Sequence, residues 1–436
     1  MLRSAYSLVL WAALPLIALK LWLRGRREPG YRRGVGERFG RYAAKAEAPV
    51  IWLHAVSVGE VRACVPLVNA LRSEYPDHVM LLTCMTAAGR EAIDQAFGTT
   101  VLAAFLPYDY PFAVRRFLDH FRPRLGILME TEIWINLLTE CKRRSLRVIL
   151  ANARMSLHSA QGYRRLSALT RPAFESLAAV CAQSEADANR IASLGAHRVD
   201  VCGNLKFDVR LDGRLLEAGA ELRREIKSGK VLAIASTREG EEALVLEALR
   251  TRNIGDVSVI VIPRHPQRFD AVATLIESAG FSLARRSRGD PPAGRQVLLG
   301  DTMGEMPTYY AAADVAIVGG TLLAYGGQNL IEASAAGVPV ILGPHVHNFS
   351  EAARLAVEHG AALQVANAAE AIDVSLSLLD DPARRESMRH AGLAFCAAHR
   401  GATRKHVEAI RASLGGEPGA PAARDALAAF ASAASS

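Results

Sequence analysis

Two glutamates stand where a carboxylate could act on a substrate. Glu60 ends the stretch Ser57-Val-Gly-Glu60, which follows an apolar run, and Glu130 comes directly after the apolar residues 125–129. A carboxylate in such a place must be hydrated, paired or used, because an unpaired buried charge is costly. Both glutamates are therefore candidates for proton transfer, and an ion pair with a nearby arginine is the alternative for Glu130.

The Ser57–Glu60 spacing has a second interpretation. Ser-x-x-Glu is also the capping box, in which Ser caps a helix and Glu reaches back to its first N–H groups. Ser236 and Glu239 have the same spacing. A helix start favours the ionised carboxylate, so Glu60 is expected to be deprotonated but a weak base. Gly59 would let a substrate approach the backbone.

A glycine-rich loop late in the chain could hold a phosphate. Residues 314–345 read DVAIVGGTLLAYGGQNLIEASAAGVPVILGPH, two apolar runs that flank the loop and a helix-forming stretch, 329–336. Gly326 and Gly327 precede that helix, and Glu332 lies in its first turn. N–H groups at a helix start attract anions, and a carboxylate there can accept from ribose hydroxyls. An ordinary strand–helix connection is the alternative.

Basic and polar residues follow other apolar runs in the same way. Ligands of parallel sheets lie beyond the carboxyl ends of the strands, so these residues are candidates for binding. Arg264 follows Pro263, whose ring restricts the backbone, and a guanidinium suits bidentate phosphate contacts. The remaining candidates at run ends are Arg154, Lys206, Ser236 and the turn 301–305 (DTMGE).

Alternating elements must position these residues. From residue 50, short apolar β-rich runs alternate with helical stretches such as 62–75 and 112–121. This pattern is typical of a doubly wound α/β sheet whose parallel strands are covered on both faces. The expected strands begin at Val50, Val79, Val101, Leu125, Arg147, Ala179 and Val199, then at Val231, Val257, Gln296, Asp314, Pro339 and Ala361.

The two series of strands predict two Rossmann-like domains facing a cleft. A chain of 436 residues is long enough for two or three domains. Residues 208–230 are rich in charged residues and are expected to form a linker with a short helix. The predicted segments are an anchor at 1–25, domains at 26–210 and 211–414, and a disordered Gly/Pro/Ala/Ser-rich tail at 415–436.

The N-terminal segment has the character of an uncleaved membrane anchor. Residues 5–23 are apolar, and as a helix they would span about 28 Å, close to the hydrocarbon thickness. Residues 20–45 hold nine Lys/Arg against two acidic residues, a local charge of +7 out of +8 for the chain. This predicts a domain on the cytoplasmic side and contact with anionic lipid. The alternatives to a spanning or deeply inserted helix are a shallow interfacial helix and a buried N-terminal helix.

Composition argues against several other classes. The six cysteines are scattered without CxxC spacing, so we expect buried free thiols in a reducing compartment and no structural metal. Charge concentrated in one segment is unlike the basic face of a folded nucleic-acid-binding domain. We therefore expect no metal, no cofactor and no nucleic-acid partner.

The motifs together resemble those of one family. They occur in the order HAVSVGE (54–60), METEIW (129–134), NARMS (152–156), GNLKFD (203–208), STREGEE (236–242), PRHPQRF (263–269), GDTMGE (300–305) and GGQNLIEASAAGVPVILGPH (326–345). This set is similar to that of the membrane-anchored 3-deoxy-D-manno-octulosonic acid (Kdo) transferases of Gram-negative bacteria. The resemblance extends from residue 1 to about residue 410.

The resemblance implies a glycosyltransferase-B (GT-B) fold at the inner membrane. The N-terminal domain would take a lipid A precursor (lipid IVA) and the C-terminal domain CMP-Kdo, with Glu60 as proton acceptor and Glu130 as a second important carboxylate. The family's GGHNPLE reads GGQNLIE here, so Gln328 replaces a histidine. The CMP contacts implied are Pro263, Arg264, Met303, Gly304, Glu305, Asn329, Leu330, Ile331 and Glu332.

These features predict an inverting transfer of Kdo from CMP-Kdo, with Glu60 as general base. Two other functions stay open. One is a membrane glycosyltransferase of the same fold that uses a UDP-sugar. The other is a membrane-tethered nucleotide-binding module without catalysis, although nucleotide binding in the second domain would not need Glu60 and Glu130.

Overall fold

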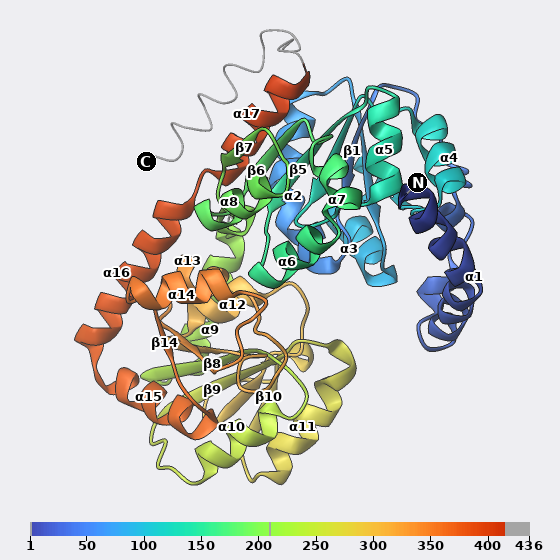
Figure 1. Ribbon diagram of the computed structural model, residues 1–436. Coiled ribbons are helices and arrows are strands. Elements are labelled where there is room, and N and C mark those ends of the chain that lie inside the picture. The colour runs from blue at the N-terminus through green and yellow to red at the C-terminus, as the bar shows by residue number, and fades with distance from the viewer. Residues whose placement is uncertain (1, 209–210, 415–436) are drawn as a thin grey trace. The chain divides into compact units, whose positions relative to one another are not determined.

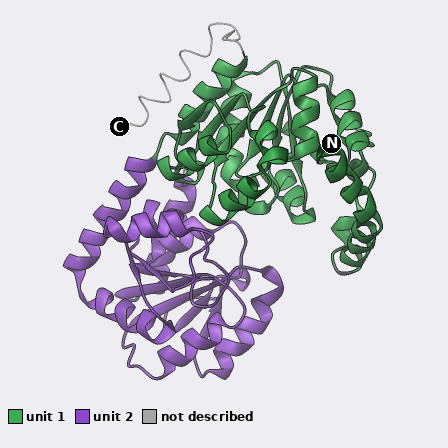
Figure 2. Ribbon diagram, in the orientation of Figure 1, with its two compact units in different colours: residues 1–208, 400–436 green, residues 209–399 purple. Residues whose placement is uncertain are grey.

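The computed structural model describes residues 2–208 and 211–414, so the tail expected to be disordered (415–436) lies outside it. In each of two compact units, helices cover both faces of one parallel sheet (Figure 1). Unit 1 holds the described residues of 1–208 and 400–436, and unit 2 those of 209–399 (Figure 2). The two series of strands predicted from the sequence thus belong to separate units.

The sheet of unit 1 has seven strands in the order β3-β2-β1-β4-β5-β6-β7, and all its pairings are parallel. All seven strands predicted in this half are confirmed. Alternate side chains of the first strand enter different cores, Ile51 and Leu53 on one face and Val50 and Trp52 on the other. The strands are β1 (Val50–His54), β2 (Val79–Cys84), β3 (Leu102–Phe105), β4 (Leu125–Met129), β5 (Arg147–Ala153), β6 (Ala179–Ala182) and β7 (Val199–Val201).

The helices of unit 1 mostly follow strands, as a doubly wound sheet requires. The two predicted helical stretches correspond to α2 and α4. The helices are α1 (Leu2–Arg27), α2 (Val58–Glu74), α3 (Ala87–Phe97), α4 (Pro111–Phe121), α5 (Ile135–Arg143), α6 (Leu157–Arg165), α7 (Ser167–Phe174), α8 (Glu185–Ser193) and α17 (Ala402–Leu414).

The sheet of unit 2 has the order β10-β11-β9-β8-β12-β13-β14 and is also parallel throughout. The sequence predicts six of its strands but not β10. The strands are β8 (Lys230–Thr237), β9 (Val257–Pro263), β10 (Leu283–Arg285), β11 (Val297–Leu299), β12 (Val315–Val318), β13 (Val340–Leu342) and β14 (Ala362–Gln364). The helices are α9 (Gly213–Ile226), α10 (Glu241–Arg250), α11 (Phe269–Ser278), α12 (Met306–Ala312), α13 (Ile331–Ala335), α14 (Ser350–Glu358), α15 (Ala368–Asp380) and α16 (Pro382–His399).

The segment 208–230 contains a helix, as predicted, but it is not a linker. Fourteen of these residues form α9, which packs on α12 within unit 2. Leu222 and Ile226 are buried, and a Cβ at Gly219 would lie 2.6 Å from the carbonyl oxygen of Thr308, so only glycine permits this close packing. The apolar residues recur at helical spacing between charged ones, and for this reason the segment lacks an apolar run.

The predicted end of the second domain at residue 414 is also wrong. Helix α17 belongs to unit 1 (Figure 2), where Ala402, Val407 and Ile410 enter the same core cluster as Ile51. The Arg411 guanidinium lies 2.5 Å from the carboxylate of Glu74 on α2. The chain therefore leaves unit 1 after β7 and returns to it with its last described helix.

We expect Ile410→Ala to lower the free energy of unfolding by about 2–5 kcal/mol, because it leaves a cavity in the core of unit 1. Ile410 is completely buried. Arg404→Ala is the matched control on the same helix, since its side chain is 71% exposed. Urea unfolding of the full chain measures both changes, and equal stability of the two variants would contradict the packing of α17 on unit 1.

Helix α1 is long and apolar enough to cross a membrane, the one such helix in the described part of the chain. It is tied to the rest of unit 1 along one side. The Tyr6 hydroxyl donates to Asp109 at 3.0 Å, and the Tyr110 hydroxyl donates to the carbonyl of Leu10 at 2.7 Å. The Trp11 ring lies 5.4 Å from that of Tyr110. The exposed large apolar side chains of α1 are Leu2, Leu8, Val9, Trp11, Leu16, Leu19, Trp22 and Leu23.

Candidate active site

The strand order of unit 1 reverses direction at β1 and β4, which are neighbours in the sheet. In doubly wound sheets such a switch point, at the carboxyl ends of the strands, is where ligands bind. The turn that starts at Ser57 follows β1, and Glu130 follows β4 directly. The topology therefore brings the two glutamates selected from the sequence to one edge of one sheet.

The capping interpretation of Ser57 and Glu60 is confirmed. The Ser57 hydroxyl accepts from the backbone N–H of Glu60 at 3.5 Å and donates to the Glu60 carboxylate at 3.0 Å. The other carboxylate oxygen accepts from the backbone N–H of Val56 at 2.9 Å. These bonds fix the position of the carboxylate at the start of α2 without excluding a part in proton transfer.

Glu60 is a stronger base than the helix start predicts. Burial, followed by the negative charge of Glu130, raises the pKa of Glu60 to about 7. The hydrogen bonds from Val56 and Ser57 act in the opposite direction but do not cancel this shift. Our expectation of a weak base is therefore wrong, because burial and a neighbouring carboxylate outweigh the local capping interactions. A pKa near 7 suits a general base that works near neutral pH.

Glu130 has a backbone conformation that is rare for a side-chain-bearing residue. Its φ is +57°, in the left-handed region, directly after β4. Its carboxylate lies 3.8 Å from the Nζ atom of Lys206. The alternative of an ion pair is thus correct in kind, although the partner is a lysine. Strained residues of this sort concentrate at functional sites, where the surrounding structure must hold them.

Arg154 also lies near this edge of the sheet. Its backbone carbonyl accepts from the Thr131 hydroxyl at 2.9 Å, so the segments that follow β4 and β5 are in contact. Unit 1 thus brings together Glu60, Glu130, Lys206 and the segment of Arg154. Gly59 lies in the first turn of α2 beside Glu60.

We expect kcat/KM to fall as the pH drops below about 7, because a general base must be deprotonated to act. In Glu130→Gln the loss of the neighbouring negative charge lowers the pKa of Glu60. The acidic limb, the part of the pH profile where kcat/KM falls with decreasing pH, therefore moves to lower pH. Glu132→Gln is the matched control and should give a smaller shift, since Glu132 contributes less to the pKa of Glu60. An acidic limb that stays in place or rises in Glu130→Gln would contradict this assignment.

Unit 2 has its own switch point, at the neighbouring strands β8 and β12. The glycine-rich loop follows β12, and a buried carboxylate organises it. Glu241 accepts from the backbone N–H groups of Gly320 at 2.6 Å, Leu322 at 2.9 Å and Arg238 at 2.8 Å. The sequence pattern does not reveal this role of Glu241, although the residue stands in the STREGEE motif.

Ser236 does not cap a helix, so the capping alternative fails here. It lies within β8 with a φ of +58°, where the register with β9 shifts. Helix α10 begins later, at Glu241, after Gly240. Ser236 thus sits at the switch point of unit 2 in a strained conformation.

Arg264 and a group of side chains around it lie near the glycine-rich loop. The Arg264 Nε–H donates to the Gln328 side-chain oxygen at 3.3 Å. Gln328, which stands where the family motif has a histidine, thus contacts a predicted site residue. An Arg238 nitrogen lies 2.7 Å from His265 Nε2, and its guanidinium lies 4.8 Å from the centre of the Tyr325 ring. Arg238 stands in the STREGEE motif, after the apolar run 231–235, but the sequence pattern assigns no role to Arg238 or to Tyr325.

The predicted turn at 303–305 presents backbone and side chains to solvent. The Met303 side chain is 54% exposed, and Gly304 has a φ of +85° that favours glycine. The Glu305 carboxylate accepts from the Thr302 hydroxyl at 2.5 Å and lies 3.4 Å from the Arg286 guanidinium. A ligand at this turn would therefore meet backbone groups and Met303 before it meets Glu305.

The helix expected at 329–336 is shorter than predicted. Helix α13 begins at Ile331 and has five residues, so its dipole is small. Asn329 accepts from the Ile331 N–H at 3.1 Å and donates to the Glu332 carboxylate at 2.9 Å. The side chains of Leu330 and Ile331 are buried, so these two residues have only their backbone to offer a ligand.

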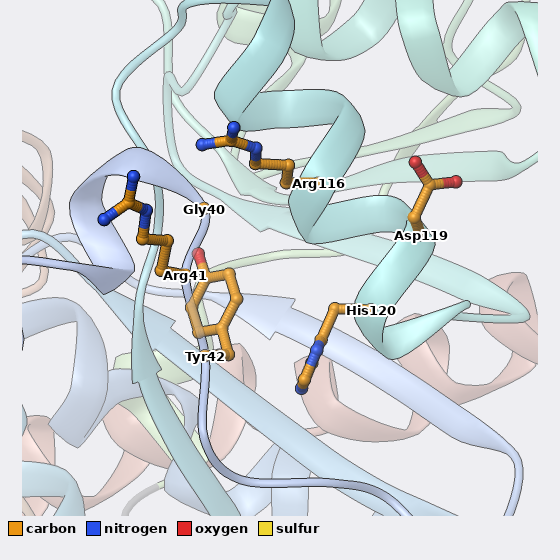
Figure 3. A pocket seen from close by; sticks show the side chains of 6 residues that line it. All are labelled: Gly40, Arg41, Tyr42, Arg116, Asp119 and His120. Carbon is orange, nitrogen blue, oxygen red and sulfur yellow. The ribbon is translucent and has the colours of Figure 1, made fainter.

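A surface pocket of about 470 Å³ lies elsewhere in unit 1 (Figure 3). Arg41 and Tyr42 reach it from the segment that follows residue 40, and Arg116, Asp119 and His120 reach it from α4. Two guanidinium groups and an imidazole make its lining basic. It contains none of the predicted site residues.

Within residues 2–208 and 211–414, no group of three or more His, Cys, Asp or Glu side chains could hold a metal ion. The six cysteines are free and buried, as predicted.

Two parallel-sheet α/β units, each with polar residues at the carboxyl ends of its switch-point strands, have the architecture of the GT-B fold. Residues 33–209 match the sequence model of the 3-deoxy-D-manno-octulosonic-acid transferases (kdotransferases), and residues 292–394 match that of the group 1 glycosyl transferases. The chain belongs to the 3-deoxy-D-manno-octulosonic acid transferase family.

Curated relatives agree with this assignment, and a solved structure has the same fold. The chain is 45% identical over 429 residues to the 3-deoxy-D-manno-octulosonic acid transferase of Bordetella pertussis, covering 95% of this chain and 100% of the relative. The Haemophilus influenzae transferase is 35% identical over 95% of this chain and 99% of its own. A glycosyltransferase structure from Rickettsia africae has a TM-score of 0.57 at 15% identity, over 85% of this chain and 100% of that one, and shows the fold alone. The protein is thus an enzyme that transfers Kdo in lipopolysaccharide biosynthesis.

Proposed function

We propose that the enzyme moves Kdo from CMP-Kdo to lipid IVA, a lipid A precursor, with inversion at the anomeric carbon. The main support is Glu60, a carboxylate with a pKa of about 7 at the switch point of unit 1. In this proposal unit 1 takes the acceptor and unit 2 takes the donor. The proposal includes the anchor at 1–25 and the domain roles that we predicted from the sequence.

Glu60 takes the proton from an acceptor sugar hydroxyl as that oxygen attacks the anomeric carbon of Kdo. The bond from this carbon to the phosphate oxygen breaks, and CMP leaves with the bonding electrons. One displacement inverts the configuration, and the proton ends on Glu60. Lys206, 3.8 Å from Glu130, offsets the charge of that carboxylate and supplies a cation for anionic substrate groups, as does Arg154.

In unit 2, Arg264 and backbone N–H groups stabilise the charge that develops on the leaving phosphate. The Gln328 contact orients the Arg264 guanidinium. The CMP contacts proposed are Pro263, Arg264, Met303, Gly304, Glu305, Asn329, Leu330, Ile331 and Glu332, with Ser236, Gly326 and Gly327 beside them. CMP-Kdo carries one phosphodiester, so these groups suffice in the proposal and no cofactor is invoked.

The test is incubation of the purified full chain with CMP-Kdo and lipid IVA, followed by mass spectrometry and nuclear magnetic resonance. We expect released CMP and a product heavier by Kdo with inverted anomeric configuration. Retained configuration would contradict a single displacement. Transfer to another acceptor only, or tighter competition by UDP than by CMP, would contradict the proposed substrates.

We also propose that α1 holds the enzyme at the cytoplasmic face of the inner membrane, against anionic lipid. The exposed basic residues of the 20–45 segment support contact with anionic lipid. Arg38 lies in the same segment but is not exposed. Arg38 is buried, stacks over Phe105 at 4.0 Å and donates to the carbonyl of Met85. The basic pocket of Arg41 and Arg116 adds positive charge near α1, because Arg116 lies over the Phe112 ring that stacks on Trp11.

We expect the double variant Arg41→Glu and Arg116→Glu to lose much of the preference for anionic vesicles. Each basic residue near such a surface contributes about 1 kcal/mol, and charge reversal adds repulsion. Co-sedimentation of the full chain with vesicles of phosphatidylcholine alone, or mixed with phosphatidylglycerol, measures the preference. Arg384→Glu with Arg404→Glu is the control with the same change of charge. An equal loss in both variants would point to net charge and contradict a role for the pocket.

A further inference from the structure

The last described helix, α17, is hydrogen-bonded to β5, the strand beside Glu130. On α17, His406 Nε2 accepts from the backbone N–H of Asn152 at 2.8 Å, and His406 Nδ1 donates to the carbonyl of Ala402 at 2.7 Å. Both His406 and Asn152 are completely buried. The backbone N–H can only donate, so His406 must be neutral with its proton on Nδ1. Burial lowers the pKa of His406 to about 4, which keeps it neutral.

Asn152 departs from ordinary strand structure at the place where His406 holds it. Its φ is +51°, and the register between β5 and β6 shifts between Leu150 and Ala153. Its side-chain oxygen accepts from the backbone N–H of Leu205 at 3.0 Å, while its side-chain nitrogen is buried and has no hydrogen-bond partner among residues 2–208 and 211–414. A strained backbone and an unsatisfied side-chain amide at Asn152 both lower the stability of the fold. Their presence therefore indicates a functional requirement at this position.

The contact of Asn152 with Leu205 leads directly to Lys206. The side chain of Asn204 accepts from the Lys206 N–H at 3.0 Å and donates to Gln183 at 3.0 Å. Gln183 in turn donates to the carbonyl of Asn152 at 2.9 Å. These bonds close a ring that fixes the backbone of the segment 204–206. The Nζ atom of Lys206, at the end of this chain of contacts, faces Glu130.

Helix α17 contacts the same segment a second time. The Asp208 carboxylate accepts from the backbone N–H of Gly401 at 2.6 Å and from that of Thr403. These N–H groups lie at the start of α17. The helix is therefore joined to the segment 204–208 at its first turn through Asp208 and at its second turn through His406 and Asn152.

We propose that His406 is a positioning residue for the reaction, which places Lys206 against Glu130 through Asn152 and the segment 204–206. The inference rests on the proposed function, because it assumes that Glu130 and Lys206 serve the transfer for which Glu60 is the base. A lysine has a long flexible side chain, so the position of its backbone determines where its charge can reach. His406 touches no substrate in this proposal.

The test compares two substitutions at one position in the full-length enzyme. His406→Gln can place an oxygen near the site of Nε2 and keep the acceptor for Asn152. His406→Asn can keep the hydrogen bond to the carbonyl of Ala402 but loses the acceptor for the Asn152 N–H. Arg404→Ala, an exposed change on the same helix, is the control.

For His406→Asn we expect kcat to fall by about tenfold or more, since small misplacements of a catalytic group cost at least this much. The KM for CMP-Kdo should not change. The acidic limb of kcat/KM should move to higher pH, because Lys206 no longer offsets Glu130 beside Glu60, whereas Glu132, Ser57 and Val56 stay as they were. His406→Gln should restore most of kcat and the original limb.

A merely structural role predicts another result. A variant that is only less stable would lose activity in proportion to its folded fraction, with an unchanged limb, and this would overturn the proposal. A crystal structure of His406→Asn with Lys206 at its original distance from Glu130 would overturn it independently of activity. If His406→Asn does not fold, Gln183→Leu breaks the same ring at the residue that follows β6. A folded Gln183→Leu enzyme with wild-type kcat and limb would also contradict the proposal.

These outcomes are distinct from a failure of the proposed function. If the wild-type enzyme transfers another sugar, or if Glu60→Gln remains active, the substrate or base assignment is wrong. The displacement of Lys206 in the crystal structure still decides whether His406 positions it.

Discussion

Glu60→Gln is expected to bind CMP as the wild-type enzyme does and to transfer Kdo at about a hundredth of its rate or less. General base catalysis contributes about 10²–10⁴-fold, and an amide cannot accept the proton. The substitution keeps the size of the side chain and an oxygen that can accept from Val56, so α2 should still begin at the same place. Initial rates with CMP-Kdo and lipid IVA, together with calorimetric titration of CMP, measure the two properties.

Glu185→Gln is the matched control for this prediction, because Glu185 also lies in the first turn of a helix capped by a serine, and its side chain is exposed. Its transfer rate should equal that of the wild type. A Glu60→Gln enzyme with nearly wild-type transfer would show that another group accepts the proton. A loss of CMP binding together with transfer would point to a folding defect instead of a missing base.

Arg264→Ala is expected to lower kcat/KM by about 10²–10³-fold, the usual effect of removing one group that stabilises developing charge. Affinity for CMP should fall as well, since the same guanidinium would contact the phosphate of the product. Arg264→Lys should have a kcat/KM between those of the wild type and Arg264→Ala. The lysine keeps a positive charge, but it lacks the planar guanidinium and the Nε–H that donates to the Gln328 side-chain oxygen. Steady-state kinetics and calorimetric titration of CMP measure these effects.

The control for Arg264 is Arg250→Ala, whose side chain is 59% exposed and pairs with Glu247 on the surface of unit 2. It should change neither parameter. If Arg264→Ala binds CMP as tightly as the control does and keeps its activity, the leaving group is stabilised elsewhere. The backbone N–H groups of the glycine-rich loop would then be the first candidates.

Much of the fold follows from local pattern, because a strand buried on both faces is a continuous apolar run. Thirteen of the fourteen strands in the described residues overlap a predicted run, although β7 contains Asp200 and is only partly buried. Strand β10 does not, since Leu283 and Ala284 are too few to form an apolar run before Arg285, whose guanidinium is held by Asp301. The sequence assigns the residues of α17 to the wrong unit. The residues of a helix show that it has an apolar face, but they do not show which core that face will pack against.

The candidate site is predictable in position but not in character. Strand ends are visible in the sequence, so Glu60, Glu130 and Arg264 can be selected from the apolar runs that they follow. The strength of Glu60 as a base depends on its burial and on the distance to Glu130, which only the folded sheet determines. The roles of Glu241 and His406 cannot be predicted from the sequence either. Glu241 accepts from the N–H groups of Gly320 and Leu322, and His406 from that of Asn152, and all three are distant in sequence.

The return of α17 to unit 1 has a consequence for biosynthesis. Residues 400–414 supply part of the core beneath β1 and the acceptor for the Asn152 N–H, yet the ribosome makes them after all of unit 2. During translation, unit 2 can complete its fold first, while the nascent unit 1 waits with an uncovered apolar surface. A ribosome that stalls before residue 400 would therefore leave a polypeptide with all of unit 2 but an incomplete unit 1.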